Sequence, residues 1–166
     1  PTRFHVTFLP TSNYLLIPRH SSERRSFIPF GFMPPDILSG DANLVTTTAT
    51  ESDFGVLQSS MHMAWVRNTC GRIKSDFRYS KEIVYNNFPW PDLTHTSKKS
   101  KPLAPVHPAQ VAIETAAQAV LNVRAKFQSG PQPATLADLY DPLTMPPELL
   151  KAHQKLDAAV DKAYEA

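Results

Sequence analysis

The chain has 166 residues, of which 42% are hydrophobic and 19% are charged, and its formal net charge is +2 at pH 7. This composition is typical of a globular protein, and no run of about eighteen apolar residues is present to span a membrane. The single cysteine, Cys70, excludes an intramolecular disulfide and a cysteine-rich zinc site. The chain starts without an initiator Met and without a signal-peptide pattern, so we expect a cytoplasmic chain that is part of a longer protein.

Short β-rich runs separated by turn residues fill positions 1–50. The runs at 4–9, 14–17 and 44–48 are apolar or β-branched, which predicts short strands. Prolines lie between these runs and restrict them to short or edge strands. They are Pro10, Pro18, Pro29, Pro34 and Pro35.

Around residue 52 the apolar period changes from that of a strand to that of a helix. Ser52 is placed to cap this helix, and Gly71 is placed to end it. The helix would carry one apolar stripe, made of Phe54, Leu57, Met61, Ala64 and Trp65. Beyond it, 72–80 alternates in the manner of a strand, and 83–85 is another short β-like run.

A proline-rich segment comes next, and the composition then becomes helical. Three helices are predicted after it, at 109–127, at 136–140 and from Pro147 to about Tyr164. The predicted fold class is therefore α+β, with short strands and one central helix followed by a helical tail. The expected domains are a partial recognition domain at 1–92, a Pro/Lys/Ser linker at 93–108 and a helical C-terminal segment at 109–166.

The sequence offers no catalytic and no metal site. The five glycines are scattered singly, so no Gly-rich phosphate loop is present, and the six histidines are dispersed without metal-ligand spacing. Cys70 has no base near it in sequence and is interpreted as a buried or bystander thiol, and His62 as a packed or surface histidine. Residues 86–90, NNFPW, lack the adjacent prolines of the Asn-Pro-Pro-aromatic motif of amino methyltransferases.

Basic residues gather at 19–25, 67–81 and 98–101, with acidic residues between these groups. A basic stripe on a nearly neutral protein suits DNA, although interspersed charge is also typical of any soluble surface. We interpret the group at 98–101 as part of a solvated linker.

Three segments together resemble a known family. They are PRHSSERR at 18–25, SSMHMAWVR at 59–67, and GRIKSDFRYS at 71–80 leading into VYNNFPWP at 84–91. These segments are similar to the target-recognition domain of the MmeI-like enzymes, single-chain bacterial proteins that join an endonuclease, an adenine-N6 methyltransferase and a DNA-reading domain. The stretch LADLYDPLTMPP at 136–147 is similar to that family's C-terminal region, so the resemblance covers nearly the whole chain.

The resemblance implies that catalysis and DNA recognition belong to different parts of the protein. The methyltransferase and any endonuclease motifs would lie upstream of Pro1, with S-adenosylmethionine bound there and Mg²⁺ serving a nuclease domain if the protein has one. This chain would hold no cofactor and no catalytic residue. Its partners would be double-stranded DNA and the upstream methyltransferase domain in cis, within an adenine-specific DNA methyltransferase or a fused restriction-modification enzyme.

Lys74 and Asp76 are the first predicted base-reading pair. If 72–80 is extended, Lys74, Asp76 and Arg78 share one face, with Ile73 and Phe77 on the other. A lysine can donate to guanine O6 and N7 while an aspartate accepts from cytosine N4, so the pair can read one G·C base pair in the major groove. The resemblance places a base-reading pair at these two positions, which predicts guanine there. The alternative is a surface salt bridge between the two side chains.

Arg19 and Asp41 form a second predicted base-reading pair by the same chemistry and the same resemblance. The alternative is that Arg19 is a surface residue beside Pro18. Other residues are candidates for contacts to the DNA backbone, which hold register without reading sequence. They are Ser21, Ser22, Arg24, Arg25, Arg72, Arg78 and Lys81. Arg78 could instead support the reading face by pairing with Asp76.

The sequence therefore predicts a DNA-recognition module that carries no chemistry of its own. The large aromatics Trp65, Phe88 and Trp90 are interpreted as packing residues and not as base-stacking platforms. The alternative function is a protein-interaction scaffold whose basic patches are incidental.

Overall fold

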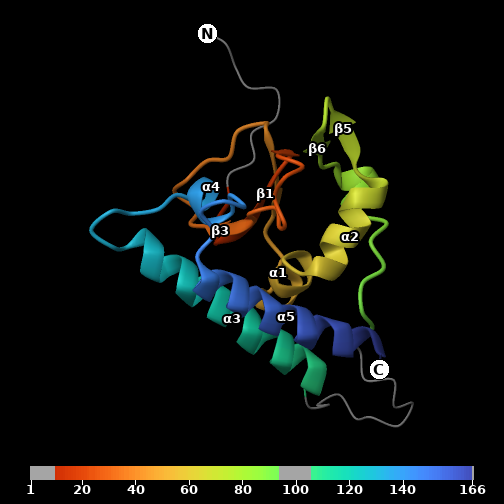
Figure 1. The fold of residues 1–166 in the computed structure, drawn as a ribbon. Coiled ribbons are helices and arrows are strands. Elements are labelled where there is room, and N and C mark those ends of the chain that lie inside the picture. Colours follow the sequence, from red (N-terminus) through yellow and green to blue (C-terminus); the bar gives the residue numbers. More distant parts are fainter. Residues whose placement is uncertain (1–9, 94–105, 166) are drawn as a thin grey trace.

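The computed structural model describes residues 10–93 and 106–165 (Figure 1). The predicted strand at 4–9 and the basic group at 98–101 lie outside these residues. The strands are β1 Tyr14–Pro18, β2 His20–Ser21, β3 Gly31–Met33, β4 Asn43–Thr46, β5 Gly71–Ile73 and β6 Asp76–Arg78. The helices are α1 Glu51–Leu57, α2 Ser60–Thr69, α3 Pro108–Gln128, α4 Leu136–Leu139 and α5 Pro147–Glu165, with a π-helix η1 at Lys81–Tyr85. The α+β class is confirmed.

The apolar run at 14–17 forms the central strand of the first sheet, whose order is β3-β1-β4. Both neighbours are antiparallel to β1, with Leu15 opposite Phe32 and Leu16 opposite Val45. Leu15 and Ile17 are buried because alternate residues of the strand point into the core. The strands predicted at 14–17 and 44–48 are thus confirmed, the second with shorter bounds.

The second sheet has the order β2-β6-β5, and one residue, Arg19, separates its strand β2 from β1. The Arg19 backbone makes a hydrogen bond to a neighbouring segment on each side. Its N–H donates to the Ala42 carbonyl at 3.0 Å, and its carbonyl accepts from the Tyr79 N–H at 2.7 Å. Arg19 therefore joins the two sheets.

The helix predicted to start at Ser52 is two helices. Thr50 caps α1 through a capping box with Asp53, so Ser52 lies inside the helix, where it is buried. At Ser59 the backbone is extended, and the Ser59 hydroxyl accepts from the His62 N–H, which starts α2. The prediction that Gly71 ends the helix is also wrong, since α2 ends at Thr69 and Gly71 begins β5.

Residues 81–85 form the π-helix η1 and not the predicted strand. The Ser80 hydroxyl caps it by accepting from the Ile83 N–H at 3.3 Å. The Asn86 N–H donates to the Lys81 carbonyl at 2.9 Å, five residues back, which is the bond that defines a π-turn.

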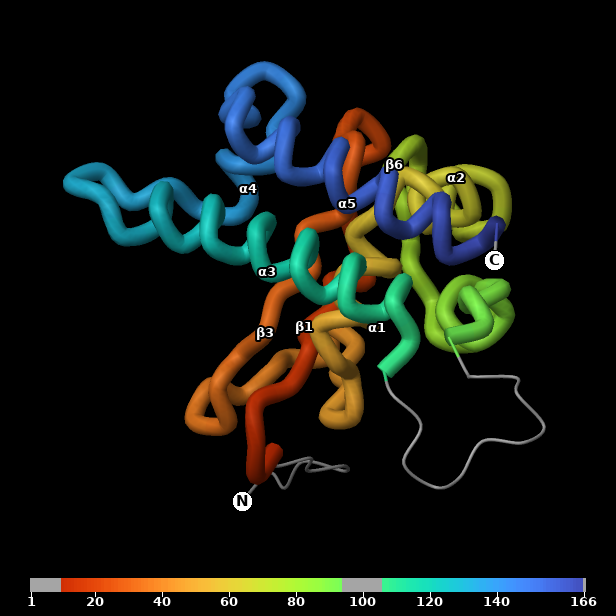
Figure 2. Tube along the Cα trace, turned by 90° about the horizontal axis from the view of Figure 1, so that it is seen from below, coloured from red at the N-terminus to blue at the C-terminus, as the bar shows by residue number. Residues whose placement is uncertain are grey.

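The three C-terminal helices are confirmed close to their predicted bounds. Figures 1 and 2 show α3 and α5 side by side, and both helices pack on α1. Gly55 allows this approach, because a Cβ at this position would lie 2.6 Å from Cγ2 of Ile113 on α3. The C-terminal helices and the strands thus contribute to one hydrophobic core. Within the described parts of the chain, no helix combines the length and the apolar character that a membrane span requires.

Candidate nucleic-acid interface

Strands β5 and β6 form a hairpin with a two-residue turn, Lys74–Ser75, between Ile73 and Asp76. In Figure 1 this hairpin extends from the side of the molecule opposite α3 and α5. Lys74 has a φ of 55°, in the left-handed region, which costs a non-glycine residue roughly 1 kcal/mol. The continuous strand expected at 72–80 is therefore wrong, and Lys74 stands at the hairpin tip.

The turn changes which side chains share a face. Ile73 is directly opposite Asp76, so these two residues lie on the same face, contrary to the prediction. Phe77 is buried on the other face, opposite Arg72. Asp76 and Arg78 do share their face, as alternation within β6 requires. The prediction holds for residues on one strand and fails across the turn.

His20 lies directly opposite Arg78 in the β2–β6 pair, and its side chain is exposed. It therefore joins Asp76 and Arg78 on the exposed face of the hairpin sheet. The sequence prediction omitted His20, because the pairing of β2 with β6 spans more than fifty positions and no local pattern indicates it.

The Asp76 carboxylate has one hydrogen-bond partner among the residues that the structure describes. Its Oδ1 accepts from the Glu23 N–H at 3.2 Å, which attaches the segment after β2 to the hairpin. The ion pairs within residues 10–93 and 106–165 are Arg72–Glu23 and Lys126–Glu148, so neither Lys74 nor Arg78 pairs with Asp76. The salt-bridge alternative for Lys74 is thus not the arrangement found, and the second carboxylate oxygen has no partner from the described chain.

Arg72 supports the hairpin from its other face. Its guanidinium lies 4.2 Å from the centre of the Phe77 ring and donates to the Ser75 carbonyl at 2.8 Å. Its ion pair with Glu23 has an N–O distance of 4.0 Å between partly exposed side chains, so that contact contributes little. These contacts hold the turn that carries Lys74.

The segments of the second predicted pair are hydrogen-bonded to each other and to the residue that follows β6. Arg19 and Asp41 are both exposed, and the bond from the Arg19 N–H to the Ala42 carbonyl brings their segments together. The Arg19 carbonyl is bonded in turn to Tyr79, beside Arg78. The structure therefore brings three distant segments, at 18–25, 40–43 and 71–80, into one hydrogen-bonded surface.

The predicted backbone-contact residues differ in exposure. Ser21 is buried, and its hydroxyl accepts from Arg25 at 3.4 Å, so it is not available at the surface. Ser22 and Arg25 are half-buried, in a tight turn closed by the bond from the Arg25 N–H to the Ser22 carbonyl. The exposed members are Arg24, Arg72, Arg78 and Lys81.

Buried polar groups beneath the hairpin are structural. The His62 ring bonds to the Tyr79 hydroxyl at 3.0 Å and anchors the end of β6 to α2. Burial lowers the pKa of His62 to about 3, so this imidazole is neutral near pH 7. Burial likewise raises the pKa of the Cys70 thiol, which keeps it protonated and a poor nucleophile.

The aromatic residues pack as predicted. Phe88 is buried, and its ring makes edge contacts with the rings of Trp65 and Trp90 at centroid distances of 6.2 and 5.4 Å. Across the part of the chain that the structure describes, no group of three or more His, Cys, Asp or Glu residues is placed to hold a metal ion.

Comparisons with known proteins identify the family of both parts of the chain. The family model for the MmeI target recognition domain matches residues 1–92, and that for the MmeI C-terminal domain matches residues 106–166. The chain is 38% identical over 164 residues to DNA methyltransferase A of Bacillus subtilis (strain 168), which covers 99% of this chain and 17% of that protein. It is also similar to the solved structure of the type IIL restriction-modification enzyme MmeI in complex with DNA, with 45% identity and a TM-score of 0.81 over 95% of this chain and 19% of the other. The chain thus spans less than a fifth of the length of either relative.

Proposed function

The chain belongs to the MmeI family through its target-recognition and C-terminal domains, and we propose that it selects the DNA sequence on which the protein containing it acts. The observation that carries this proposal is the backbone hydrogen bonding of Arg19, which joins the segment of Asp41 to the segment that forms the β5–β6 hairpin. A two-stranded ribbon of this kind can enter the major groove of B-DNA. The similarity to a relative solved with DNA supports the same conclusion.

Lys74 and Asp76 would read one G·C base pair. The tip position of Lys74 lets its ammonium extend beyond the strands toward guanine O6 and N7, which are both acceptors. The Asp76 oxygen that Glu23 does not occupy would accept from the cytosine N4 amino group. We therefore expect guanine on the strand that Lys74 contacts.

Arg19 and Asp41 would read a second G·C pair, since arginine binds guanine and aspartate binds the paired cytosine. Their segments are held together by the backbone of Arg19. The residues proposed to hold the phosphates are Ser22, Arg24, Arg25, Arg72, Arg78 and Lys81. His20 is added to this surface because it lies opposite Arg78.

The reaction itself would take place in another part of the protein. We propose an adenine-N6 methyltransferase domain in cis that binds S-adenosylmethionine, and Mg²⁺ in any nuclease domain. This chain has only isolated glycines and no metal-binding cluster in its described part, so we derive no catalytic step from it. Methylation of a base in a duplex requires extrusion of that base, and this module would hold the DNA while another domain extrudes it.

The test is selection from a random DNA library by the complete protein, followed by sequencing of the bound fraction. The charge exchange Lys74→Glu with Asp76→Arg should change one position of the selected motif from G to C. The matched control is the exchange Lys126→Glu with Glu148→Lys, an exposed ion pair on the C-terminal helices, which should leave the motif unchanged.

Two outcomes would contradict the proposal at different levels. A motif that keeps the same base at every position after the Lys74 and Asp76 exchange refutes the base-reading assignment. A wild-type protein that selects no sequence refutes DNA recognition and favours a protein-interaction scaffold.

A further inference from the structure

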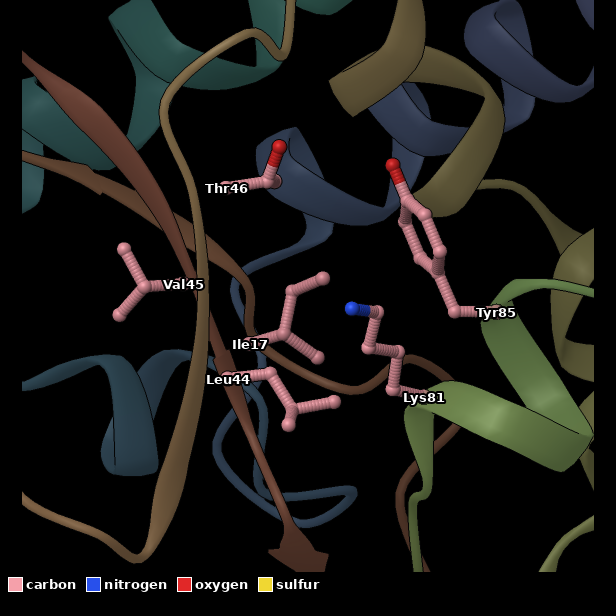
Figure 3. Close-up of a pocket in the computed structure, with 6 residues that line it drawn as sticks. All are labelled: Ile17, Leu44, Val45, Thr46, Lys81 and Tyr85. Carbon is pink, nitrogen blue, oxygen red and sulfur yellow. The ribbon is translucent and has the colours of Figure 1, made fainter. Parts of the chain in front are cut away.

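A pocket of about 200 Å³ lies between the first sheet and the π-helix η1, next to the recognition surface. Figure 3 shows the six side chains that line it: Ile17, Leu44, Val45, Thr46, Lys81 and Tyr85. Aliphatic side chains from β1 and β4 supply an apolar wall. The ammonium of Lys81 and the hydroxyls of Thr46 and Tyr85 supply the polar groups.

The π-turn places Lys81 and Tyr85 on the same pocket. Such a wide turn is uncommon and is found often at functional sites. Here it is held on both sides, by the Ser80 cap and by the Tyr85 ring, which makes an edge contact with Trp90 at a centroid distance of 5.6 Å. The two polar side chains are therefore presented by a supported element and not by a loose loop.

The charged side chain that lines the pocket is that of Lys81. Lys81 is exposed and belongs to neither of the ion pairs found in the described chain. The Asp53 carboxylate acts on the titration of Tyr85 and so contributes negative charge near the pocket. Asp53 is already engaged in the cap of α1, where it accepts from the Thr50 N–H at 2.7 Å and from the Thr50 hydroxyl at 2.9 Å. Lys81 is therefore a cation with no ion-pair partner among residues 10–93 and 106–165.

Tyr85 remains a hydrogen-bond donor at neutral pH. Burial raises the pKa of its phenol, Asp53 raises it further, and a hydrogen bond with Thr46 acts in the opposite direction. A protonated phenol and an ammonium can both donate to one phosphate group.

The pocket adjoins the proposed base-reading residues along three separate segments. Ile17 is two residues before Arg19, Leu44 is three residues after Asp41, and Lys81 is three residues after Arg78. Because the Arg19 backbone is bonded to both neighbouring segments, hydrogen bonds join the segments that line the pocket to those that carry the proposed base-reading residues.

On these grounds we infer that the pocket binds one sugar-phosphate unit of the DNA backbone, an inference that rests on the proposed function. A DNA backbone alternates an anionic phosphate with a largely apolar deoxyribose face. The phosphate would take hydrogen bonds from Lys81 and Tyr85, and the sugar would pack on the half-buried Leu44. The contact fixes the position of the duplex relative to the hairpin and carries no sequence information.

The test is a methylphosphonate scan of the selected DNA site, in which each phosphate in turn is made neutral and binding to the complete protein is measured. In the wild type, one neutral phosphate at the edge of the motif should weaken binding. In Lys81→Gln that same position should lose its effect, while the other sensitive positions keep theirs. The salt dependence of log Kd should also decrease by about 1 in Lys81→Gln, because one phosphate contact is lost.

Two further variants complete the test. Tyr85→Phe keeps the ring against Trp90 and should weaken binding several-fold without changing the salt slope or the selected motif. Lys151→Gln removes an exposed lysine on α5 and should behave as the wild type. A Lys81→Gln protein that keeps the wild-type phosphate profile and slope overturns the pocket inference while the proposed function stands. A wild type without sequence selection overturns the proposed function and this inference with it.

Discussion

The guanidinium of Arg124 on α3 donates a hydrogen bond of 2.6 Å to the backbone carbonyl of Phe30, 94 positions earlier in the chain. Arg124 is only 3% exposed, and it also donates to the Tyr140 hydroxyl at 2.6 Å and to the Gln58 side chain. Its described partners are neutral, so this cation is held by dipoles and aromatic rings in place of a carboxylate. A C-terminal helix thus holds the segment that follows the turn at 22–25.

Replacement of Arg124 should destabilise the whole chain. Arg124→Met fills similar space but leaves the Phe30 carbonyl and the Gln58 side chain without their donor in the core. We expect a loss of about 3 kcal/mol in the free energy of unfolding. Denaturant unfolding followed by circular dichroism measures it. Lys126→Met, which removes an exposed lysine two residues away, should change that free energy by less than about 1 kcal/mol; equal effects of the two variants would contradict the role of Arg124.

The left-handed backbone at Lys74 allows its side chain to be tested apart from the turn. Lys74→Gly should keep or slightly raise stability, by up to about 1 kcal/mol, because glycine adopts a φ of 55° without strain. The same variant should lose the guanine preference at one position of the selected motif. Library selection and thermal unfolding check the two effects. Lys74→Val is the matched control for the backbone, and a Lys74→Val protein as stable as Lys74→Gly would show that the turn is not strained.

Gly55 should be intolerant of a methyl group. In Gly55→Ala the new Cβ would lie 2.6 Å from Cγ2 of Ile113 and 3.2 Å from Cβ of Ala117, so α3 must move away from α1. We expect a cost of about 1–3 kcal/mol, seen as a lower Tm. Gly40→Ala is the control, because a Cβ there meets no atom within 4 Å and Gly40 does not have a positive φ. Equal Tm values for the two variants would refute the close packing.

Acid should destabilise the fold through two buried histidines. Burial lowers the pKa of His62 to about 3, and burial together with Arg124 lowers that of His153 to about 3. The unfolded chain, with pKa values near 6.5, then binds more protons than the folded chain between about pH 6.5 and pH 3. The free energy of unfolding should therefore be independent of these groups above about pH 7. Below that it should fall by about 1.4 kcal/mol per pH unit for each histidine.

Unfolding midpoints measured between pH 7.5 and pH 4.5 check the sign and the slope. A His62→Gln variant should show about half of the wild-type pH dependence, because one of the two groups has been removed. A wild type whose stability is flat over this range would contradict the neutral, buried state of both imidazoles.

The sequence by itself determined the features that depend on neighbouring residues. Helix α5 was predicted because Pro147 suits a first helical turn, and β1 because a short apolar run is bounded by turn residues. The family, and with it the proposed roles of Lys74 and Asp76, also followed from local motifs. These inferences needed only the order of apolar and turn residues, the position of a proline and short sequence motifs.

The tertiary structure decided how those residues are arranged. The turn at Lys74–Ser75 contains neither glycine nor asparagine, so its sequence does not indicate a hairpin, and strand alternation was wrongly carried across it. Hydrogen bonds between residues far apart in sequence join Arg19 to the segments of Asp41 and Tyr79. A bond of the same kind joins Arg124 to Phe30. Such bonds form only where the core brings distant backbone groups together, because a buried donor or acceptor must find whatever partner the packing supplies.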